Sequence, residues 1–381
     1  MLISCSAIPV ATLCMNHESE LTQESPQSLS SNYNVNFQLE KQVETESDPM
    51  KALISPDKNT IFTFTLPTDF STEERKKSHW WLASKGLLLQ GVSFPFPIQQ
   101  AVISQNGIIN ISIGSDNAIY LGDLRVGKAP ITMLKSSSEH QSETITSVAV
   151  SPNGKTALTG TVDGKITLWN LEIPKELYEL NAHKGSISTL AFNPDGTTFV
   201  SGGDKTVRLW NSSTGMQLQL LENLQLPPRS AEFSPDGDTI LFIIPKTAVL
   251  WNPQTKEQIP LVGHTRPILS TALSSDGKTA LTGSADKTAR LWDTKTGTLL
   301  QTFKKHTGLV NTVAFDPTNE IALTGSNDKT ARLWNTKTGK LLKTLYHNAP
   351  VHHVAFSPDG KKLYTITKNG TFSIWSRTVS S

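Results

Sequence analysis

Short stretches of alternating hydrophobic and polar residues recur along most of the chain and predict β-strands. One pair of stretches, 187–192 and 198–201, flanks a tight turn, and a third, 206–210, ends at a tryptophan. A fourth kind of stretch follows a Thr-Gly turn, as at 298–303. Alternation with a period of two is typical of strands that bury one face. The pattern therefore predicts units of four short antiparallel strands.

This unit repeats with a period of about 41 residues. Seven of the eight tryptophans follow that spacing, and their last five gaps are 41, 41, 41, 42 and 41 residues. The gap of 88 residues between Trp81 and Trp169 is about two periods long, and Gly122 stands where a tryptophan is missing. The seven are Trp81, Trp169, Trp210, Trp251, Trp292, Trp334 and Trp375.

A turn of the Ser-Pro-Asp-Gly type recurs independently of the tryptophans. Proline and glycine at these positions favour a β-turn. A lone four-stranded sheet cannot bury both faces, whereas a ring of such sheets can, so the repeat predicts an all-β propeller. The eight turns begin at Ser55, Ser104, Ser151, Asn193, Ser234, Ser274, Asp316 and Ser357.

Over about residues 50–381 the sequence resembles the WD-repeat β-propeller family. Gly263-His264 matches the Gly-His element of that family, and Trp292-Asp293 matches its Trp-Asp element. In the other units the second element is mostly Trp-Asn, as in Trp334-Asn335. The resemblance implies a closed ring of four-stranded blades.

The last unit lacks residues for a fourth strand, because Ser381 lies only six residues after Trp375. An unpaired edge would remain unless another segment filled the position. Residues 35–39 are predicted to do so, which gives eight blades within a single propeller domain, 34–381, preceded by a disordered or signal-like arm, 1–33. The alternative is seven blades closed by 86–90, with 34–81 packed outside the ring.

Several units carry a Ser or Thr, a His, an Asp and a Trp at fixed offsets. Seen once, such a set would suggest an acyl-transfer triad. Seen at the period of the blades, it cannot be one unique active site, and the resemblance implies a buried network that fixes each blade. The predicted structural sets are His183, Ser201, Asp204 and Trp210; His264, Thr282, Asp286 and Trp292; and His306, Thr324, Asp328 and Trp334.

Other units depart from this pattern, and their networks are predicted to be incomplete. A degenerate set consists of His347, Thr365, Asn369 and Trp375. In the unit of Trp251, Leu224 and Pro245 occupy the His and Asp positions. The unit of Trp169 keeps Thr159 and Asp163 but has Gln141 at the His position, the unit of Gly122 keeps Asp116, and the first unit has Arg75 where Asp is expected.

Composition narrows the function classes. The 35 Lys and Arg nearly balance the 33 Asp and Glu, so the net charge of +2 argues against a dedicated nucleic-acid binder. The two cysteines, Cys5 and Cys14, leave the rest of the chain without a disulfide or a thiol nucleophile. No run of 18 apolar residues occurs, so no transmembrane helix is expected. The adjacent His352 and His353 point to opposite faces of a strand, and neither a metal nor a cofactor is predicted.

Residues 1–15 are mostly apolar but lack the positive start of a secretory signal. A cytoplasmic location is predicted, with export as the alternative if these residues are the remainder of a signal segment.

The family's geometry places the turns before the third strands and the loops between blades on one face, the top. Loops on a rigid scaffold commonly carry specificity. Two insertions, 66–78 and 134–143, belong to top-face connections, and the first contains Arg75, Lys76 and Lys77. A lysine also recurs in the top-face turns, where a basic ring would favour an acidic or phosphorylated partner. The alternative is that these lysines are merely solvated turn residues. They are Lys165, Lys205, Lys246, Lys287, Lys329 and Lys368.

The leading hypothesis is a monomeric, non-enzymatic scaffold that binds a protein or peptide on its top face. One alternative is an enzyme or small-molecule binder acting at the central channel, although the first strands are mostly apolar and small, as in residues 313–315. The other alternative is an exported protein that acts outside the cell. A fold alone does not choose among these functions.

Overall fold

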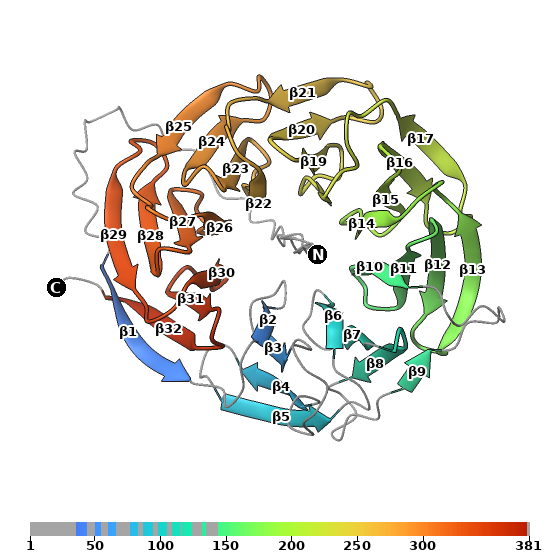
Figure 1. The fold of residues 1–381 in the computed structure, drawn as a ribbon, viewed down its shortest axis with the longest axis horizontal. Coiled ribbons are helices and arrows are strands. Elements are labelled where there is room, and N and C mark those ends of the chain that lie inside the picture. Colours follow the sequence, from blue (N-terminus) through green and yellow to red (C-terminus); the bar gives the residue numbers. More distant parts are fainter. Residues whose placement is uncertain are drawn as a thin grey trace, which may run out of the picture.

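The strands that the alternating pattern predicts form eight four-stranded antiparallel sheets among the residues that the structure describes. The sheets follow one another around a ring (Figure 1). The structure is a computed structural model, and no helix long and apolar enough to cross a membrane occurs in its described part. It describes residues 36–43, 50–54, 60–65, 77–82, 87–93, 98–104, 109–114, 116–123, 132–134 and 144–378.

The first four sheets, in chain order, are named I to IV. Sheet I consists of β2 (Met50–Ile54), β3 (Thr60–Thr65), β4 (Lys77–Leu82) and β5 (Leu87–Ser93). Sheet II consists of β6 (Ile98–Ile103), β7 (Ile109–Gly114), β8 (Ile119–Asp123) and β9 (Thr132–Leu134). Sheet III consists of β10 (Ile145–Val150), β11 (Thr156–Thr161), β12 (Lys165–Asn170) and β13 (Lys175–Asn181). Sheet IV consists of β14 (Ile187–Phe192), β15 (Thr198–Gly203), β16 (Thr206–Asn211) and β17 (Gln217–Leu221).

The remaining sheets are V to VIII. Sheet V consists of β18 (Ser230–Phe233), β19 (Ile240–Ile244), β20 (Thr247–Trp251) and β21 (Gln258–Leu261). Sheet VI consists of β22 (Ile268–Leu273), β23 (Thr279–Ser284), β24 (Ala289–Asp293) and β25 (Leu299–Phe303). Sheet VII consists of β26 (Val310–Phe315), β27 (Ile321–Ser326), β28 (Thr330–Asn335) and β29 (Leu341–Tyr346). Sheet VIII consists of β30 (Val351–Phe356), β31 (Lys362–Thr367), β32 (Phe372–Thr378) and β1 (Asn36–Val43).

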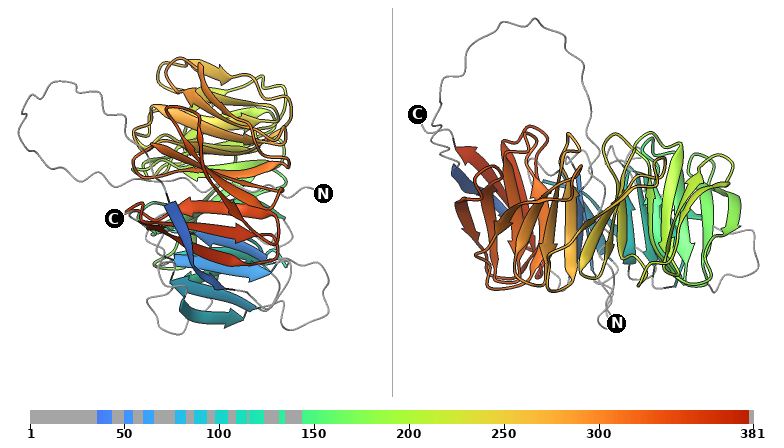
Figure 2. Two further views of the ribbon diagram at one scale, coloured as in Figure 1. Left: turned by 90° about the vertical axis from the view of Figure 1, so that its left-hand side faces the viewer. Right: turned by 90° about the horizontal axis from the view of Figure 1, so that it is seen from above.

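The N-terminal strand β1 supplies the outer strand of sheet VIII, beside β32 (Figure 2). Leu39 lies opposite Trp375, as Leu299 lies opposite Trp292, so β1 takes the position that β25 takes in sheet VI. Val35, predicted as part of this strand, lies outside the described residues. In the seven-blade alternative residues 86–90 would close the ring, but β5 pairs with β4 inside sheet I.

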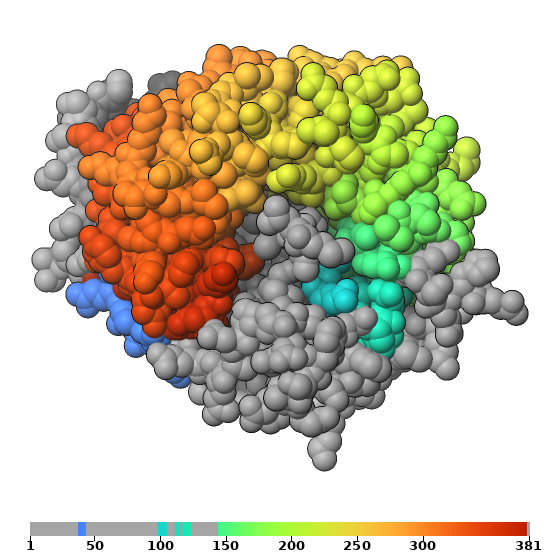
Figure 3. All heavy atoms as spheres, in the orientation of Figure 1, coloured from blue at the N-terminus to red at the C-terminus, as the bar shows by residue number. Residues whose placement is uncertain are grey.

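The hydrophobic core lies between neighbouring sheets rather than at one centre. Between sheets VI and VII, Leu281 and Leu291 pack against Val313 and Trp334. In sheets III to VIII the tryptophan of the third strand thus faces the preceding sheet, which explains why it recurs with the sheet period. From sheet III to sheet VIII the side chains form a continuous wall around the ring (Figure 3).

The Ser-Pro-Asp-Gly turns are held by their own side chains. In sheet V, Ser234 Oγ accepts a hydrogen bond from Thr239 N at 2.9 Å and donates one to Asp236 Oδ1 at 2.5 Å. The final glycine of the turn, Gly237, has φ of 80°, in the left-handed region that glycine adopts without strain.

The order of the strands defines two ends of the ring. The connections between second and third strands, and those between successive sheets, lie at the end called here the top end. The turns between first and second strands, and between third and fourth strands, lie at the opposite, bottom end. Both predicted insertions belong to top-end connections. Apart from Lys77 and Ser78 in β4 and Leu134 in β9, they lie outside the described residues, as do Arg75 and Lys76.

Candidate functional site

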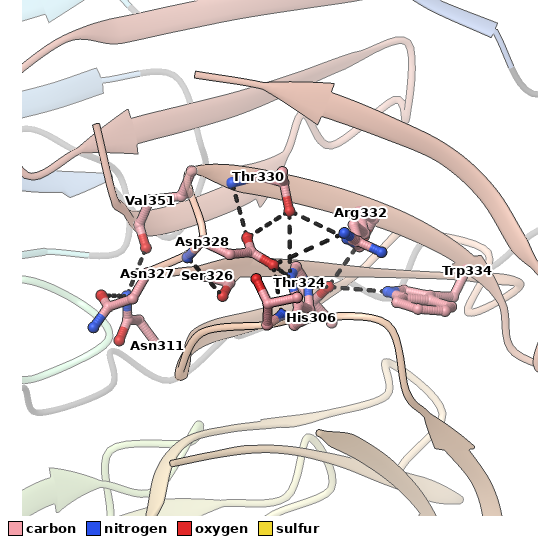
Figure 4. Close-up of polar contacts among 11 residues, drawn as sticks. His306, Asn311, Thr324, Ser326, Asn327, Asp328, Thr330, Arg332, Trp334 and Val351 are labelled. Atoms are coloured by element: carbon pink, nitrogen blue, oxygen red, sulfur yellow. Dashed lines mark hydrogen bonds and ion pairs between the residues drawn. The ribbon is translucent and has the colours of Figure 1, made fainter. Parts of the chain in front are cut away.

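The polar set of sheet VII lies at the boundary with sheet VI and joins four side chains in one line (Figure 4). Trp334 Nε1 donates to Thr324 Oγ1 at 2.9 Å. Thr324 Oγ1 lies 2.7 Å from His306 Nε2, and His306 Nδ1 lies 2.8 Å from Asp328 Oδ2. The four residues come from β28, β27, the connection before β26 and the turn before β28. The set therefore ties both top-end connections of the sheet to its core.

The directions of these hydrogen bonds assign the proton positions. An indole N–H can only donate, so Thr324 Oγ1 accepts from Trp334 and its own proton is free for His306 Nε2. The imidazole then carries its proton on Nδ1 and donates it to Asp328. Each group in the line donates to the next, which satisfies the donors and acceptors of a buried polar chain.

Sheets IV and VI repeat this arrangement with the predicted residues. In sheet VI, His264 lies 2.7 Å from Asp286 and 2.8 Å from Thr282, which accepts from Trp292 at 2.9 Å. In sheet IV the corresponding distances are 2.7 Å for His183 to Asp204, 2.7 Å for His183 to Ser201 and 2.8 Å for Trp210 to Ser201.

Electrostatics favours the neutral form of His183 and His264 and the charged form of their aspartate partners. Burial, the largest influence, lowers the pKa of His183 and of His264 despite their aspartate partners. Burial alone would raise the pKa of Asp204. The hydrogen bonds from His183, from the Lys184 N–H and from Thr206 outweigh that effect and hold this pKa at about 2. A neutral imidazole that donates to a carboxylate is the state that both shifts favour.

This geometry resembles a catalytic triad but cannot act as one. The hydroxyls of Ser201, Thr282 and Thr324 belong to side chains with 0% exposure, so no substrate reaches them. Their acceptor lone pairs are also engaged by the indole N–H groups. The three sets thus have the geometry of structural ties within the blades.

Further side chains that the sequence pattern did not identify join these networks. A threonine two residues after the aspartate donates to it, as Thr330 Oγ1 does to Asp328 Oδ1 at 2.6 Å. In sheets IV and VII an arginine two residues further contacts both, as Arg332 does with Nε 3.2 Å from Thr330 Oγ1 and Nη2 3.9 Å from Asp328 Oδ2. In sheet VI the buried Nε of Arg290 has no hydrogen-bond partner in the described part of the chain. The repeated sequence Asp-Lys-Thr-x-Arg-Leu-Trp contained this signal, because its Thr and Arg recur with the same period.

The sheets whose sequences depart from the full set of four residues form only part of the network. In sheet VIII, Trp375 Nε1 donates to Thr365 at 3.0 Å, but the buried His347 Nε2 has no partner in the described part of the chain. Asn369 accepts from Thr367 and Thr371 instead of anchoring the imidazole. Burial lowers the pKa of His347 to about 4.

Sheets II, III and V differ further from the full set. Trp169 donates to Thr159 at 2.8 Å, while Asp163 accepts from Thr161. Asp116 accepts from Tyr120 at 2.9 Å. In sheet V, Leu224 and Pro245 are half-buried and offer no polar side chain. Gln141 and Arg75 lie outside the described residues.

One buried acid was missed by the prediction that the first strands are apolar and small. Glu232 in β18 is 5% exposed, and its Oε1 accepts a hydrogen bond of 2.8 Å from Thr271 in β22 of the next sheet. Burial raises the pKa of Glu232 to about 7, against the opposing effect of that bond. The position equivalent to Glu232, two residues before the turn, is alanine in sheets III, IV, VI, VII and VIII. The signal available in the sequence was therefore a single acid where those five units have alanine.

The six predicted basic-ring lysines do not occupy one equivalent position. Lys165, which was predicted to lie in a top-face turn, is instead the first residue of β12. It is half-buried and pairs with Glu179 at 3.5 Å. Lys368 lies seven residues before its tryptophan. In the described part of the chain, exposed lysines five residues before the tryptophan occur in four turns, at Lys205, Lys246, Lys287 and Lys329.

Comparison with known proteins identifies the repeat. The family model "WD domain, G-beta repeat" matches five stretches that together cover half of the chain. They are residues 131–170, 174–211, 255–293, 297–335 and 339–376.

Curated relatives match over short regions. Protein ROOT INITIATION DEFECTIVE 3 of Arabidopsis thaliana is 25% identical over 116 residues, which is 30% of this chain and 26% of the relative. Eukaryotic translation initiation factor 3 subunit I of Anopheles gambiae is 36% identical over 69 residues, which is 18% of this chain and 21% of the relative. Periodic tryptophan protein 2 homolog of Neurospora crassa is 40% identical over 63 residues, which is 16% of this chain and 7% of the relative. The chain thus spans about a quarter or less of the length of these relatives.

Proposed function

We propose that this chain, which belongs to the WD-repeat family, is a non-enzymatic scaffold that binds a protein or peptide at the top end of its ring. Members of this family are typically protein-interaction scaffolds.

The observation that carries the proposal is the way the polar sets hold the top end. Each aspartate accepts a backbone N–H from the connection that precedes its sheet: Lys184 N at 2.8 Å, Thr265 N at 3.1 Å and Thr307 N at 3.0 Å. The side chains of these same three residues are exposed. Loops held in one conformation bind with less loss of conformational entropy, so this end is pre-organised for a partner.

The same bonds argue against catalysis at these sets. A hydrolytic or acyl-transfer reaction needs a nucleophile that a substrate can approach. In sheets IV, VI and VII the candidate hydroxyls are fully buried, and the imidazoles are 0% exposed at their side chains. The networks are built to position loops, which supports a binding role for the end that they shape.

Site-directed photo-crosslinking tests which end binds the partner. With Cys5→Ser and Cys14→Ser as background, the full chain would carry either Thr265→Cys at the top end or Gln254→Cys at the bottom end. Both native residues are exposed and belong to turns or connections of neighbouring strands. Each cysteine is labelled with the same photo-crosslinker and incubated with lysate from the source cells.

We expect a discrete crosslinked protein from the label at position 265 and none, or a much weaker one, from position 254. Unlabelled protein in excess should compete with the crosslink. Crosslinking that is equal from both positions, or stronger from position 254, would contradict a top-end binding site.

A further inference from the structure

The top end of sheets IV to VIII carries exposed cations with almost no exposed anions between them. Among the described residues of these connections Glu222 is the only exposed acid, because Asp204, Asp286 and Asp328 are engaged by the polar sets. These cations are named here the basic arc. The basic arc consists of Lys184, Lys205, Arg229, Lys246, Arg266, Lys287, Lys304, Lys305, Lys329 and Lys368.

The basic arc ends at sheet III. There the top-end turn exposes Asp163, and Lys165 is neutralised by Glu179. The basic arc therefore covers the top ends of five consecutive sheets, IV to VIII, and not every top-end turn of the ring. Besides the turn lysines, the basic arc includes cations from the connections between sheets.

The bottom end has a different charge pattern, because its cations lie beside acids. Lys278 Nζ is 3.9 Å from Asp276, and Lys155 Nζ is 3.1 Å from Glu172. Further acids, such as Asp195 and Glu320, lie in the same set of turns. Among the described residues of sheets IV to VIII, exposed cations that lie away from exposed acids are thus concentrated at the top end. Such a distribution attracts and orients an anionic partner.

Backbone conformation supports a role for the turn lysines beyond solvation. Lys205, Lys287 and Lys329 have φ between 63° and 71°, in the left-handed region that favours glycine and asparagine. At the equivalent position sheets III and VIII have glycine, Gly164 and Gly370.

The bottom-end turns between third and fourth strands provide the comparison. Their left-handed positions hold Gly215, Gly297 and Gly339, with Lys256 as the exception in sheet V. At the top end, by contrast, a charged side chain occupies the strained position in three of the five sheets of the basic arc.

We propose that the basic arc binds an extended polypeptide segment rich in aspartate and glutamate. This inference rests on the proposed function, since it names the partner class for the same end. Lysines predominate in the arc, and an ammonium group acts as a point charge, whereas phosphate recognition favours the bidentate fork of arginine. Spaced ammonium groups along a curved series of loops match the diffuse charge of a carboxylate-rich segment.

The test is fluorescence anisotropy with the full chain and a fluorescein-labelled peptide rich in Glu and Asp. A second peptide has Gln and Asn in place of the acids. The arc variant carries Lys246→Glu, Arg266→Glu and Lys287→Glu, none of which belongs to a buried polar set. The matched control carries Lys278→Glu, Lys295→Glu and Lys337→Glu, which make the same change in net charge at exposed bottom-end positions.

We expect the native chain and the bottom-end control to bind the acidic peptide with similar affinity, and neither to bind the Gln/Asn peptide. The arc variant should bind at least about tenfold more weakly at an ionic strength of about 0.1 M, because three attractions become repulsions. Equal weakening by both variants would show a mere net-charge effect and overturn the proposal. Absent binding of the acidic peptide, or tighter binding of duplex DNA or anionic vesicles at the same ionic strength, would also overturn it.

The crosslinking experiment separates failure of this inference from failure of the proposed function. The arc variant can be combined with the label at position 265. Retained crosslinking with the arc variant would leave the top-end site standing and overturn only the acidic partner. Loss of the crosslink in the arc variant, with retention in the bottom-end control, supports both.

Discussion

Replacing Glu232 by glutamine should stabilise the protein at alkaline pH and change it little in mild acid. Burial raises the pKa of Glu232 from 4.5 to about 7. Between these values the folded chain keeps a proton that the unfolded chain has released, so the free energy of unfolding falls as the pH rises. Above pH 7 the native protein therefore carries a destabilising buried charge worth roughly 3 kcal/mol. Glu232→Gln removes that charge and retains an oxygen that can accept from Thr271.

The measurement is urea denaturation of both proteins across the pH range, with the difference between them attributed to Glu232. The side chain faces a surface without compensating charge, because neither β19 nor β22 contains a charged residue. Glu222→Gln is the matched control, since Glu222 is an exposed acid in the connection before the same sheet. A difference between Glu232→Gln and the native chain that does not vary with pH would refute the buried-charge interpretation.

Replacing Thr324 by valine should cost more stability than the same change at Thr365. Both side chains are fully buried and accept a hydrogen bond from a tryptophan indole. Thr324→Val leaves both Trp334 Nε1 and His306 Nε2 without a partner, for a loss of about 2–5 kcal/mol in the free energy of unfolding. Thr365→Val leaves only Trp375 Nε1 unpaired, because His347 Nε2 already lacks a partner, and should cost about 1–3 kcal/mol.

Valine has nearly the shape of threonine, so the comparison isolates the hydroxyl group. Urea denaturation of the two variants and the native chain measures the two losses. Equal losses, or a smaller loss at Thr324, would mean that the His306 interaction contributes nothing and that the network does not fix the blade.

The sequence was sufficient for the fold because a similar turn recurs in every unit and the tryptophan recurs in all units but that of Gly122. A tryptophan that packs against the preceding sheet is needed once per sheet. The spacing of the tryptophans along the chain therefore equals the length of the repeating unit. The missing outer strand beside β32 was also predictable, since an unpaired edge in a closed ring is unfavourable. The bulge of β1 opposite Trp375, between Leu39 and Lys41, repeats the bulge that β25 forms opposite Trp292.

The polar network was only partly predictable from spacing. The fixed spacing placed His347 in the same set as Thr365. A hydrogen bond between the two depends on an aspartate that orients the imidazole, but this sheet has Asn369, which accepts from Thr367 and Thr371 instead. Arg332 was overlooked because a repeated arginine looks like a surface residue until its contact with Asp328 is seen.

The candidate binding surface was the least predictable part. Lys165 and Lys205 differ by one position relative to their tryptophans, which moves Lys165 from the turn into a strand beside Glu179. Residues such as Arg229 and Arg266 lie in connections that follow no obvious repeat. Only the arrangement of the strands shows that these connections and the lysine turns share one end of the ring.

Hydrogen–deuterium exchange of the full chain, with and without the acidic peptide, tests the central claim most directly. The claim is that polar sets fix the top end of the ring so that its cations bind an acidic partner. We predict added protection in the connections 222–229, 262–267 and 304–309 and no change in the Ser-Pro-Asp-Gly turns. Protection at those bottom-end turns, or none at the top-end connections with the peptide bound, would contradict it.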